Sequence, residues 1–104
     1  MILEAAQIHV KAGEEAAFEA AMRKAAPVIA RTDGYLSHIL QRCVETPGRY
    51  LLLVHWETLE AHTVNFRESP AFPEWRAIIG PFFASAPVVE HYEEVLQYRC
   101  EAVR

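Results

Sequence analysis

The sequence predicts an α+β fold of the ferredoxin-like type: a four-stranded antiparallel sheet in the order β-α-β-β-α-β, with two helices on one face. Three observations lead to this prediction. The chain has 104 residues, which is enough for one domain with one core. Hydrophobic residues make up 52% and charged residues 23%, a balance typical of compact globular proteins. Apolar residues recur first with the period of a strand and then with that of a helix, in the stated order.

The first strand is predicted over residues 2–10, where apolar and polar residues roughly alternate. We assign one side of this strand to the core and the other to solvent; the core side holds Ile2, Ala6, Ile8 and Val10, and the solvent side holds Glu4, Gln7 and His9. Gly13 interrupts the pattern. From Glu14 onward, Phe18, Met22 and Ile29 follow the spacing of a helix face, and Pro27 is expected to kink the last turn.

A hairpin is predicted next, because Asp33-Gly34 ends the helix and Pro47-Gly48 separates two strands over residues 35–44 and 49–57. The second of these, containing YLLLVHW, is apolar at nearly every position and is therefore expected to be a central strand. If the strand over residues 35–44 directs Leu36, Leu40 and Val44 toward the core, then His38 lies on the same face.

Helical spacing returns after the hairpin. Thr58 is expected to cap a short helix whose inward residues are Leu59, His62 and Phe66. Ser69-Pro70 begins a second helix, which carries Phe72, Trp75 and Ile79 and ends at Gly80-Pro81. A fourth strand is predicted over residues 88–98, where Val88, Tyr92 and Leu96 alternate with charged residues.

Two helices cover only one face of such a sheet, and the apolar strand over residues 49–57 implies that the other face is also apolar. We therefore expect a homodimer in which two sheets pack face to face. The chain is divided into a domain over residues 1–95 and a tail over residues 96–104, and residues 94–103 are expected to be able to reach the edge of the partner's sheet.

Charge and composition exclude several classes of function. The net charge is -4 and the basic residues are scattered, so no nucleic-acid partner is expected. No apolar stretch approaches the length of a membrane span, and the N-terminus lacks the pattern of a signal peptide, which predicts a cytoplasmic protein without membrane contact. Cys43 and Cys100 form no metal-binding or disulfide pattern and are interpreted as reduced thiols, and no metal or nucleotide motif is present.

A family resemblance is carried by residues 56–83, WETLEAHTVNFRESPAFPEWRAIIGPFF, where a strand ending in Trp-Glu leads into a helix followed by Ser-Pro-x-Phe. The segment Ile8 to Gly13 and the Gly-Tyr-Leu at residues 34–36 add to it. Over roughly residues 1–95, the chain resembles the antibiotic biosynthesis monooxygenase family. The resemblance implies a dimeric α/β barrel with a cavity between sheet and helices. In some members it implies oxidation of aromatic polyketides or quinols by dioxygen without a metal or flavin cofactor.

Such a reaction needs an acidic phenol or enol, a base and a dry apolar cavity. His62 is the first candidate for the base, because it shares the inward helix face with Phe66 and an imidazole titrates near neutral pH. His38 is the second candidate. The alternative for His62 is a structural histidine bonded to a backbone carbonyl. In quinol-type members the helix histidine corresponds to Phe66 here, so the base has either moved by one turn or the quinol reaction has been lost.

Several other residues are candidates for substrate binding. The aromatic side chains can line a slot for a planar ligand, with some of them belonging to the core; they are Phe66, Phe72, Trp75, Phe82 and Phe83. Possible hydrogen-bond donors are Asn65, Arg76 and Tyr92. The haem-degrading relatives use an asparagine, a tryptophan and a histidine at places that hold Ala6, Phe66 and Arg76 here, so haem degradation is not expected.

The leading hypothesis is therefore a cofactor-independent monooxygenase that acts on a quinol-like or polycyclic phenolic molecule. One alternative is a non-catalytic dimeric barrel that binds a small apolar metabolite. A second is an isomerase on the same fold, which would use the same base without oxygen.

Overall fold

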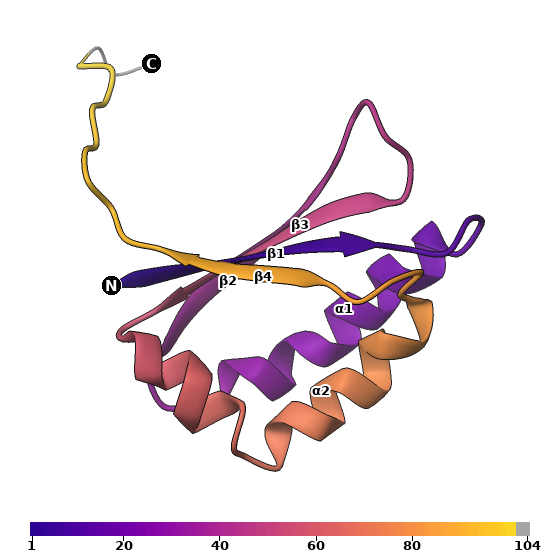
Figure 1. Cartoon of the computed structure of the whole chain (residues 1–104), viewed down its shortest axis with the longest axis horizontal. Coiled ribbons are helices and arrows are strands. Elements are labelled where there is room, and N and C mark those ends of the chain that lie inside the picture. Colours follow the sequence, from indigo (N-terminus) through magenta and orange to yellow (C-terminus); the bar gives the residue numbers. More distant parts are fainter. Residues whose placement is uncertain (102–104) are drawn as a thin grey trace.

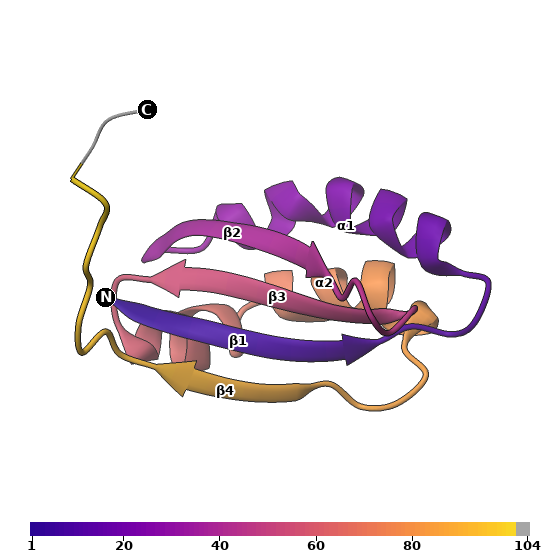
Figure 2. The ribbon, with the colours of Figure 1, turned by 90° about the horizontal axis from the view of Figure 1, so that it is seen from above.

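The computed structural model describes residues 1–101 and confirms the predicted ferredoxin-like order of elements. One antiparallel sheet has the strand order β2-β3-β1-β4 (Figure 2), where the strands are β1 (Ile2–His9), β2 (Tyr35–Arg42), β3 (Arg49–Trp56) and β4 (Val88–Tyr92). The helices α1 (Glu15–Ala30) and α2 (Ala71–Ile79) pack on the same face of the sheet (Figure 1). Before and after α2 come a π-helix, η1 (Ala61–Phe66), and a short 3-10 helix, η2 (Gly80–Phe82).

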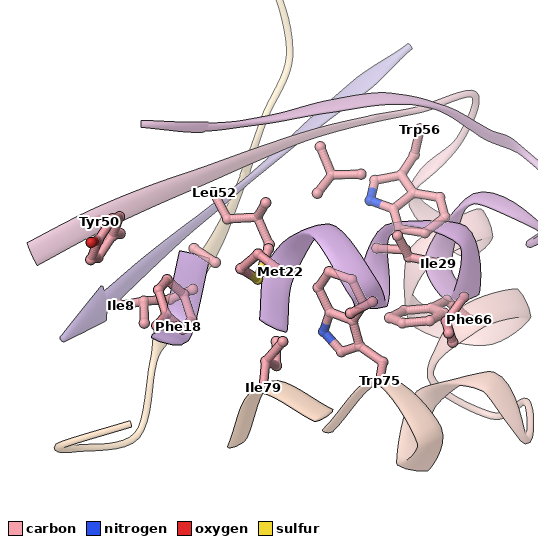
Figure 3. Close-up of a cluster of buried hydrophobic side chains, with 14 of the residues drawn as sticks. Ile8, Phe18, Met22, Ile29, Tyr50, Leu52, Trp56, Phe66, Trp75 and Ile79 are labelled. Carbon is pink, nitrogen blue, oxygen red and sulfur yellow. The ribbon is translucent and has the colours of Figure 1, made fainter. Parts of the chain in front are cut away.

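The core lies between the sheet and the helices. β3 is central as predicted, because it pairs with β1 on one side and β2 on the other. Leu52 on β3 lies over Met22 on α1, and Trp56 on β3 lies beside Ile29 on α1 and above Phe66 (Figure 3). All five side chains are buried and belong to one apolar core between the sheet and the helices.

The prediction for β1 was wrong at one position. Glu4 faces the helices together with Ala6 and Ile8, and only 6% of its surface is exposed. Period-two alternation places residues 4, 6 and 8 on one side of a strand. A carboxylate in the core is tolerated here because Trp56 hydrogen bonds to it.

The faces of β2 also differ from the prediction. A bulge lies between Tyr35 and Ser37, because these two residues pair with the neighbours Trp56 and His55 on β3. The extra residue, Leu36, is turned out and is 45% exposed. His38 and Leu40 remain on the helix side, half-buried, whereas β2 ends at Arg42.

Val44, which was predicted to face inward at the end of this strand, is 91% exposed. It lies in the loop between β2 and β3, beyond the point where Cys43 N–H donates its hydrogen bond to the carbonyl of Arg49. Because the strand has already ended, alternation no longer determines the orientation of this side chain.

The connection from β3 to the helices follows the prediction in part. Thr58 Oγ1 accepts a hydrogen bond from Ala61 N–H at 3.1 Å, as a capping residue does. His62 and Phe66 are buried, but Leu59 precedes η1 and is 39% exposed, so it does not belong to the inward stripe. The turns of η1 are wider than those of an α-helix, with Arg67 N–H bonded to the carbonyl of His62 at 3.1 Å.

β4 is shorter than predicted. It ends at Tyr92, which pairs with Leu3 near the beginning of β1, so the chain beyond Tyr92 has no strand of this sheet beside it. Leu96 is 83% exposed, and the segment after β4 leads away from the sheet (Figure 1). The proposed contact of residues 94–103 with a partner extends past the described residues, and 102–104 lie outside them.

The sheet face opposite the helices carries apolar side chains. Four of them are between 40% and 56% exposed: Ile39 on β2, Leu51 on β3, and Val88 and Tyr92 on β4. Within residues 1–101 nothing covers this face. No helix in the described part of the chain has the length and apolarity needed to cross a membrane.

Candidate active site

A cavity of about 600 Å³ lies between the sheet and the helical layer formed by η1 and α2. Ala6, Ile8 and Val89 form its wall on the sheet, and residues 85–87, which precede β4, close one side. Most of the remaining lining is apolar or aromatic. A cavity of this size and lining is typical of a site for a small organic molecule.

One end of the cavity holds a group of hydrogen-bonding side chains from four different elements. Trp56 Nε1–H on β3 donates a hydrogen bond of 3.0 Å to Glu4 Oε1 on β1. His62 on η1 places its Nε2 at 3.4 Å from the same carboxylate oxygen. The other ring nitrogen of His62, Nδ1, is hydrogen bonded at 2.7 Å to Nε2 of His91 on β4. Glu4, His62 and His91 therefore form a continuous chain of proton-carrying groups.

Burial shifts the pKa values of all three groups toward their neutral forms. Desolvation raises the pKa of Glu4, opposed by the Trp56 hydrogen bond and the charge of Arg67. The pKa of His62 falls to about 4, mainly through desolvation and further through the positive charges of Arg67 and His91. Burial and Arg67 also lower the pKa of His91. At neutral pH both imidazoles are therefore uncharged and able to accept or donate a hydrogen bond.

Aromatic rings surround this end of the cavity. The indole of Trp56 stacks on His62 with ring centres 5.3 Å apart and planes 19° apart. Phe66 meets the edges of Phe72 and Trp75 at centre distances of 5.4 and 6.1 Å. Figure 3 shows Trp56, Phe66 and Trp75 directed toward one another from the sheet and the helices. The packing holds these rings in place and presents the flat, apolar surfaces that a planar ligand needs.

Two arginines provide positive charge in the cavity lining. Arg67 follows η1, and Arg76 lies on α2, where its guanidinium carbon is 5.7 Å from the centre of the Phe72 ring. Both are largely exposed to solvent. They can donate hydrogen bonds to an anionic oxygen of a ligand.

Six of the ten residues named as candidates for the site line this cavity. They are His62, Phe66, Phe72, Trp75, Arg76 and Phe83. Ala6, Phe66 and Arg76, which stand at the places used by haem-degrading relatives, also line it.

The other four lie elsewhere. Phe82 belongs to η2 and packs against Phe18 of α1, with ring centres 6.3 Å apart. His38 faces a separate hollow beside Arg42 and Tyr50, and its Nδ1 is hydrogen bonded to the hydroxyl of Tyr35 at 2.6 Å. Asn65 is turned to the surface, where its amide donates to the carbonyl of Asp33 at 3.0 Å. Tyr92 lies on the opposite face of the sheet, because Val89 and His91 take the inward positions of β4.

Three residues of the site were missed by sequence reasoning: Glu4, Arg67 and His91. Alternation alone could have found two of them, since Glu4 has the phase of Ala6 and Ile8, and His91 has the phase of the inward Val89. Arg67 has no such signal, because it follows a π-helix whose wider turns change the direction of the next side chain. Among residues 1–101, no three histidine, cysteine or acidic side chains are grouped closely enough to hold a metal ion.

Comparison with known proteins gives consistent matches over most of the chain. The family described as antibiotic biosynthesis monooxygenase matches residues 1–78. The uncharacterized protein YczJ of Bacillus subtilis (strain 168) is 48% identical over 95 residues, which are 91% of this chain and 100% of the relative.

Solved structures agree with this result. A Bordetella bronchiseptica protein assigned as an antibiotic biosynthesis monooxygenase superposes with a TM-score of 0.89 and 45% identity, covering 91% of this chain and 97% of that one. A Caulobacter crescentus protein with the same assignment has a TM-score of 0.76 and 28% identity, covering 91% of this chain and 90% of that one.

Proposed function

Because the chain belongs to the antibiotic biosynthesis monooxygenase family, we propose that it is a cofactor-independent monooxygenase that oxidises a quinol-like or polycyclic phenolic molecule with dioxygen. The observation that carries this proposal is the meeting of an aromatic cavity of about 600 Å³ with a buried acid–base group, Glu4 and His62, at one end. A planar phenol fits the first feature and proton removal needs the second.

The reaction needs no electron source beyond the substrate. In a phenol that tautomerises to a ring ketone, a CH₂ group becomes C=O, one oxygen atom of O₂ enters the product and the other leaves as water. The substrate supplies all four electrons and both hydrogens. Removing its acidic proton creates the electron-rich anion that reacts with O₂, so the protein contributes a base and a dry, oriented site.

Each group of cavity residues has a role in this scheme. Phe66, Phe72 and Trp75 hold the ring system by packing against its faces and edges. Arg67 and Arg76 stabilise the negative oxygen of the substrate anion. The segment over residues 85–87 limits access of water to the reacting carbon.

We further propose that the protein is a homodimer. The support for this comes from the apolar outer face of the sheet, where Ile39, Leu51 and Val88 are exposed in the single chain. A second copy packed on this face would bury them, and a contact between two equivalent sheets closes without leaving a further open surface.

Oxygen uptake by the metal-free protein tests the proposed reaction. Dithranol (1,8-dihydroxyanthrone) and simple quinols serve as substrates, and His62→Ala and His38→Ala are measured beside the unaltered chain. We expect enzyme-dependent uptake that falls about 100-fold or more in His62→Ala, because the acid–base group is broken, and that persists in His38→Ala. Ligand binding without uptake by the unaltered chain would contradict the proposal and favour a binding protein, and isomerisation without uptake would favour an isomerase.

A further inference from the structure

The group at the end of the cavity contains two candidate bases, and their contacts distinguish them. Both nitrogens of His62 already face a partner: Nδ1 is 2.7 Å from His91 Nε2, and Nε2 is 3.4 Å from Glu4 Oε1. The imidazole is also stacked on Trp56 and is 2% exposed. A ring held in this way has no free lone pair to offer to a substrate.

Glu4 is different, because its two carboxylate oxygens are not equivalent. Oε1 receives the contacts from Trp56 and His62, whereas Oε2 makes no hydrogen bond within residues 1–101. Oε2 is also not fully buried. Within residues 1–101, one fully buried side-chain oxygen or nitrogen lacks a hydrogen-bond partner, and that atom is Thr32 Oγ1, not Glu4 Oε2. Glu4 lines the cavity, so Oε2 is the unoccupied acceptor at its polar end.

The hydrogen-bond directions agree with an ionised Glu4. If His62 carries its proton on Nε2, that N–H points at the carboxylate, and Nδ1 can accept the N–H of His91. Every proton then faces an acceptor. The opposite tautomer of His62 turns a lone pair toward Oε1 and needs a protonated carboxyl. A His91 that carries its proton on Nε2 therefore supports the tautomer of His62 that stabilises the carboxylate.

We infer that Glu4 is the residue that accepts the substrate proton, while His62 and His91 are positioning residues that orient its carboxylate. The inference rests on the proposed function for the class of substrate. The substrate O–H bond breaks, its electron pair stays on the substrate oxygen, and a new O–H bond forms at Glu4 Oε2. The negative charge moves from Glu4 to the phenolate, beside Arg67. The proton later leaves with the oxygen atom that becomes water.

The surroundings of Glu4 favour this exchange of charge. Trp56 from β3, His62 from η1, Arg67 after η1 and His91 from β4 are the polar and charged groups that act on this site. Burial makes the carboxylate more basic than in water, because its pKa is raised. Arg67 limits that rise and then attracts the phenolate, so one cation serves both states.

A redox-stable phenol separates the base from the oxygenation step. The probe is alizarin (1,2-dihydroxyanthraquinone), whose absorption moves to longer wavelength when a hydroxyl ionises, and it is titrated under nitrogen at a pH below its first pKa in solution. We expect the ionised band in the unaltered protein and in His62→Gln, whose amide can still donate to Oε1. Glu4→Gln, which keeps the shape but cannot take a proton, should lose it. Glu4→Asp should restore part of it.

Turnover provides the second measurement. With dithranol, kcat is expected to fall about 100-fold or more in Glu4→Gln and by less than about tenfold in His62→Gln. The matched control is Glu68→Gln, an exposed residue of the segment after η1, which should match the unaltered chain in both assays. Circular dichroism establishes that each variant is folded.

Three outcomes overturn the inference: an ionised probe in folded Glu4→Gln, its absence in folded His62→Gln, or its absence in the unaltered protein. The proposed function fails separately. Ionisation of the probe without oxygen uptake from any substrate would contradict the monooxygenase proposal but support Glu4 as the base. Oxygen uptake that persists in Glu4→Gln would support the monooxygenase proposal but show that Glu4 is not the base.

Discussion

Trp56 affects both the pKa and the orientation of the Glu4 carboxylate. Its indole is fully buried and donates a hydrogen bond of 3.0 Å to Glu4 Oε1. This bond lowers the pKa of Glu4 and partly offsets the effect of desolvation, which raises it. The same indole stacks on His62. One side chain of the central strand therefore orients both members of the acid–base group.

Replacing Trp56 with Phe tests this role. Loss of the N–H donor should raise the pKa of Glu4 further, because the ionised form loses the hydrogen bond from Trp56. A base acts only when ionised, so the acid limb of the pH–rate profile should move to higher pH. Tyr50→Phe is the control, since Tyr50 lies on the same face of β3 but donates to Glu19, away from the cavity. Equal acid limbs in Trp56→Phe and the unaltered chain would contradict the prediction.

His62 should make the fold sensitive to acid. Its pKa falls from 6.5 to about 4 on folding, so between these values the unfolded chain binds a proton that the folded chain excludes. The free energy of unfolding should therefore decrease as the pH is lowered through this window. Each proton contributes a slope of at most about 1.4 kcal/mol per pH unit. The raised pKa of Glu4 acts in the opposite direction.

His62→Gln isolates the contribution of the imidazole. Glutamine does not titrate, so the difference in unfolding free energy between the variant and the unaltered chain should shrink as the pH falls from about 7 to about 4. Urea denaturation at several pH values measures it. The contribution of Glu4 is present in both chains and largely cancels. A difference that stays constant over this range would show that His62 is not responsible.

The π-helix η1 presents the histidine of the site, and its position depends on a glycine outside it. Gly34 has a φ of +91°, and a Cβ added there would lie 2.5 Å from Cβ of Ala61, the residue before His62. The carbonyl of Gly34 also accepts the N–H of Glu57 at 2.8 Å, which joins this turn to the end of β3. The turn before β2 therefore fixes how closely η1 approaches the sheet.

Gly34→Ala should consequently lower the free energy of unfolding by more than a change to alanine at another glycine with positive φ. Gly13→Ala is the matched control, because Gly13 has a φ of +84° but no atom within 4 Å of an added Cβ. Both variants carry backbone strain, of about 1–3 kcal/mol, and only Gly34→Ala adds the collision with Ala61. Denaturant unfolding should show the larger loss for Gly34→Ala. Equal losses would mean that η1 moves away without cost.

The order and type of the elements were predictable from periodicity, and the exceptions have physical causes. The bulge at Leu36 adds one residue to β2, and residues 35–37 contain no glycine or proline that would have indicated it. The apolar alternation of β4 continues to Leu96, but pairing stops at Tyr92 because β1 begins there. In both cases the pairing with a neighbouring strand determines the local structure, and that strand is not adjacent in the pattern from which the prediction was made.

The site was harder to predict than the fold. Six of its predicted residues line the cavity, because aromatic and apolar spacing on the helices determines which side faces the sheet. Glu4 was assigned to solvent, since an unpaired carboxylate in a core is unfavourable. Trp56, which satisfies it, is 52 residues away in sequence, and His62 is further still. Sequence spacing alone does not reveal such a pairing.

The whole molecule has two unlike faces. The helices and the cavity occupy one side of the sheet, and the other side exposes apolar residues from β2, β3 and β4. The proposed homodimer accounts for this asymmetry. In that arrangement the cavity, on the far side of each sheet, stays separate from the contact between subunits.

Leu51→Lys tests the dimer. Leu51 lies on the outer face of central strand β3 and is 40% exposed, and a charge there should oppose the packing of two sheets. We expect light scattering after gel filtration to show a dimer for the unaltered chain and a monomer for the variant. Val64→Lys is the control, because Val64 has a similar exposure of 44% but belongs to η1 on the helical side. A monomeric unaltered chain would contradict the proposal.

The cavity wall over residues 83–89 lies near the C-terminus, and this has a consequence for synthesis. It is attached through the bridge between Val10 and Phe83 and through the pairing of β4 with β1. As the chain leaves the ribosome, β1, β2, β3 and both helices emerge before this wall does. The buried residues of the apolar core therefore leave the ribosome before the last wall of the cavity does. A ligand that needs this wall can bind only after β4 has paired with β1.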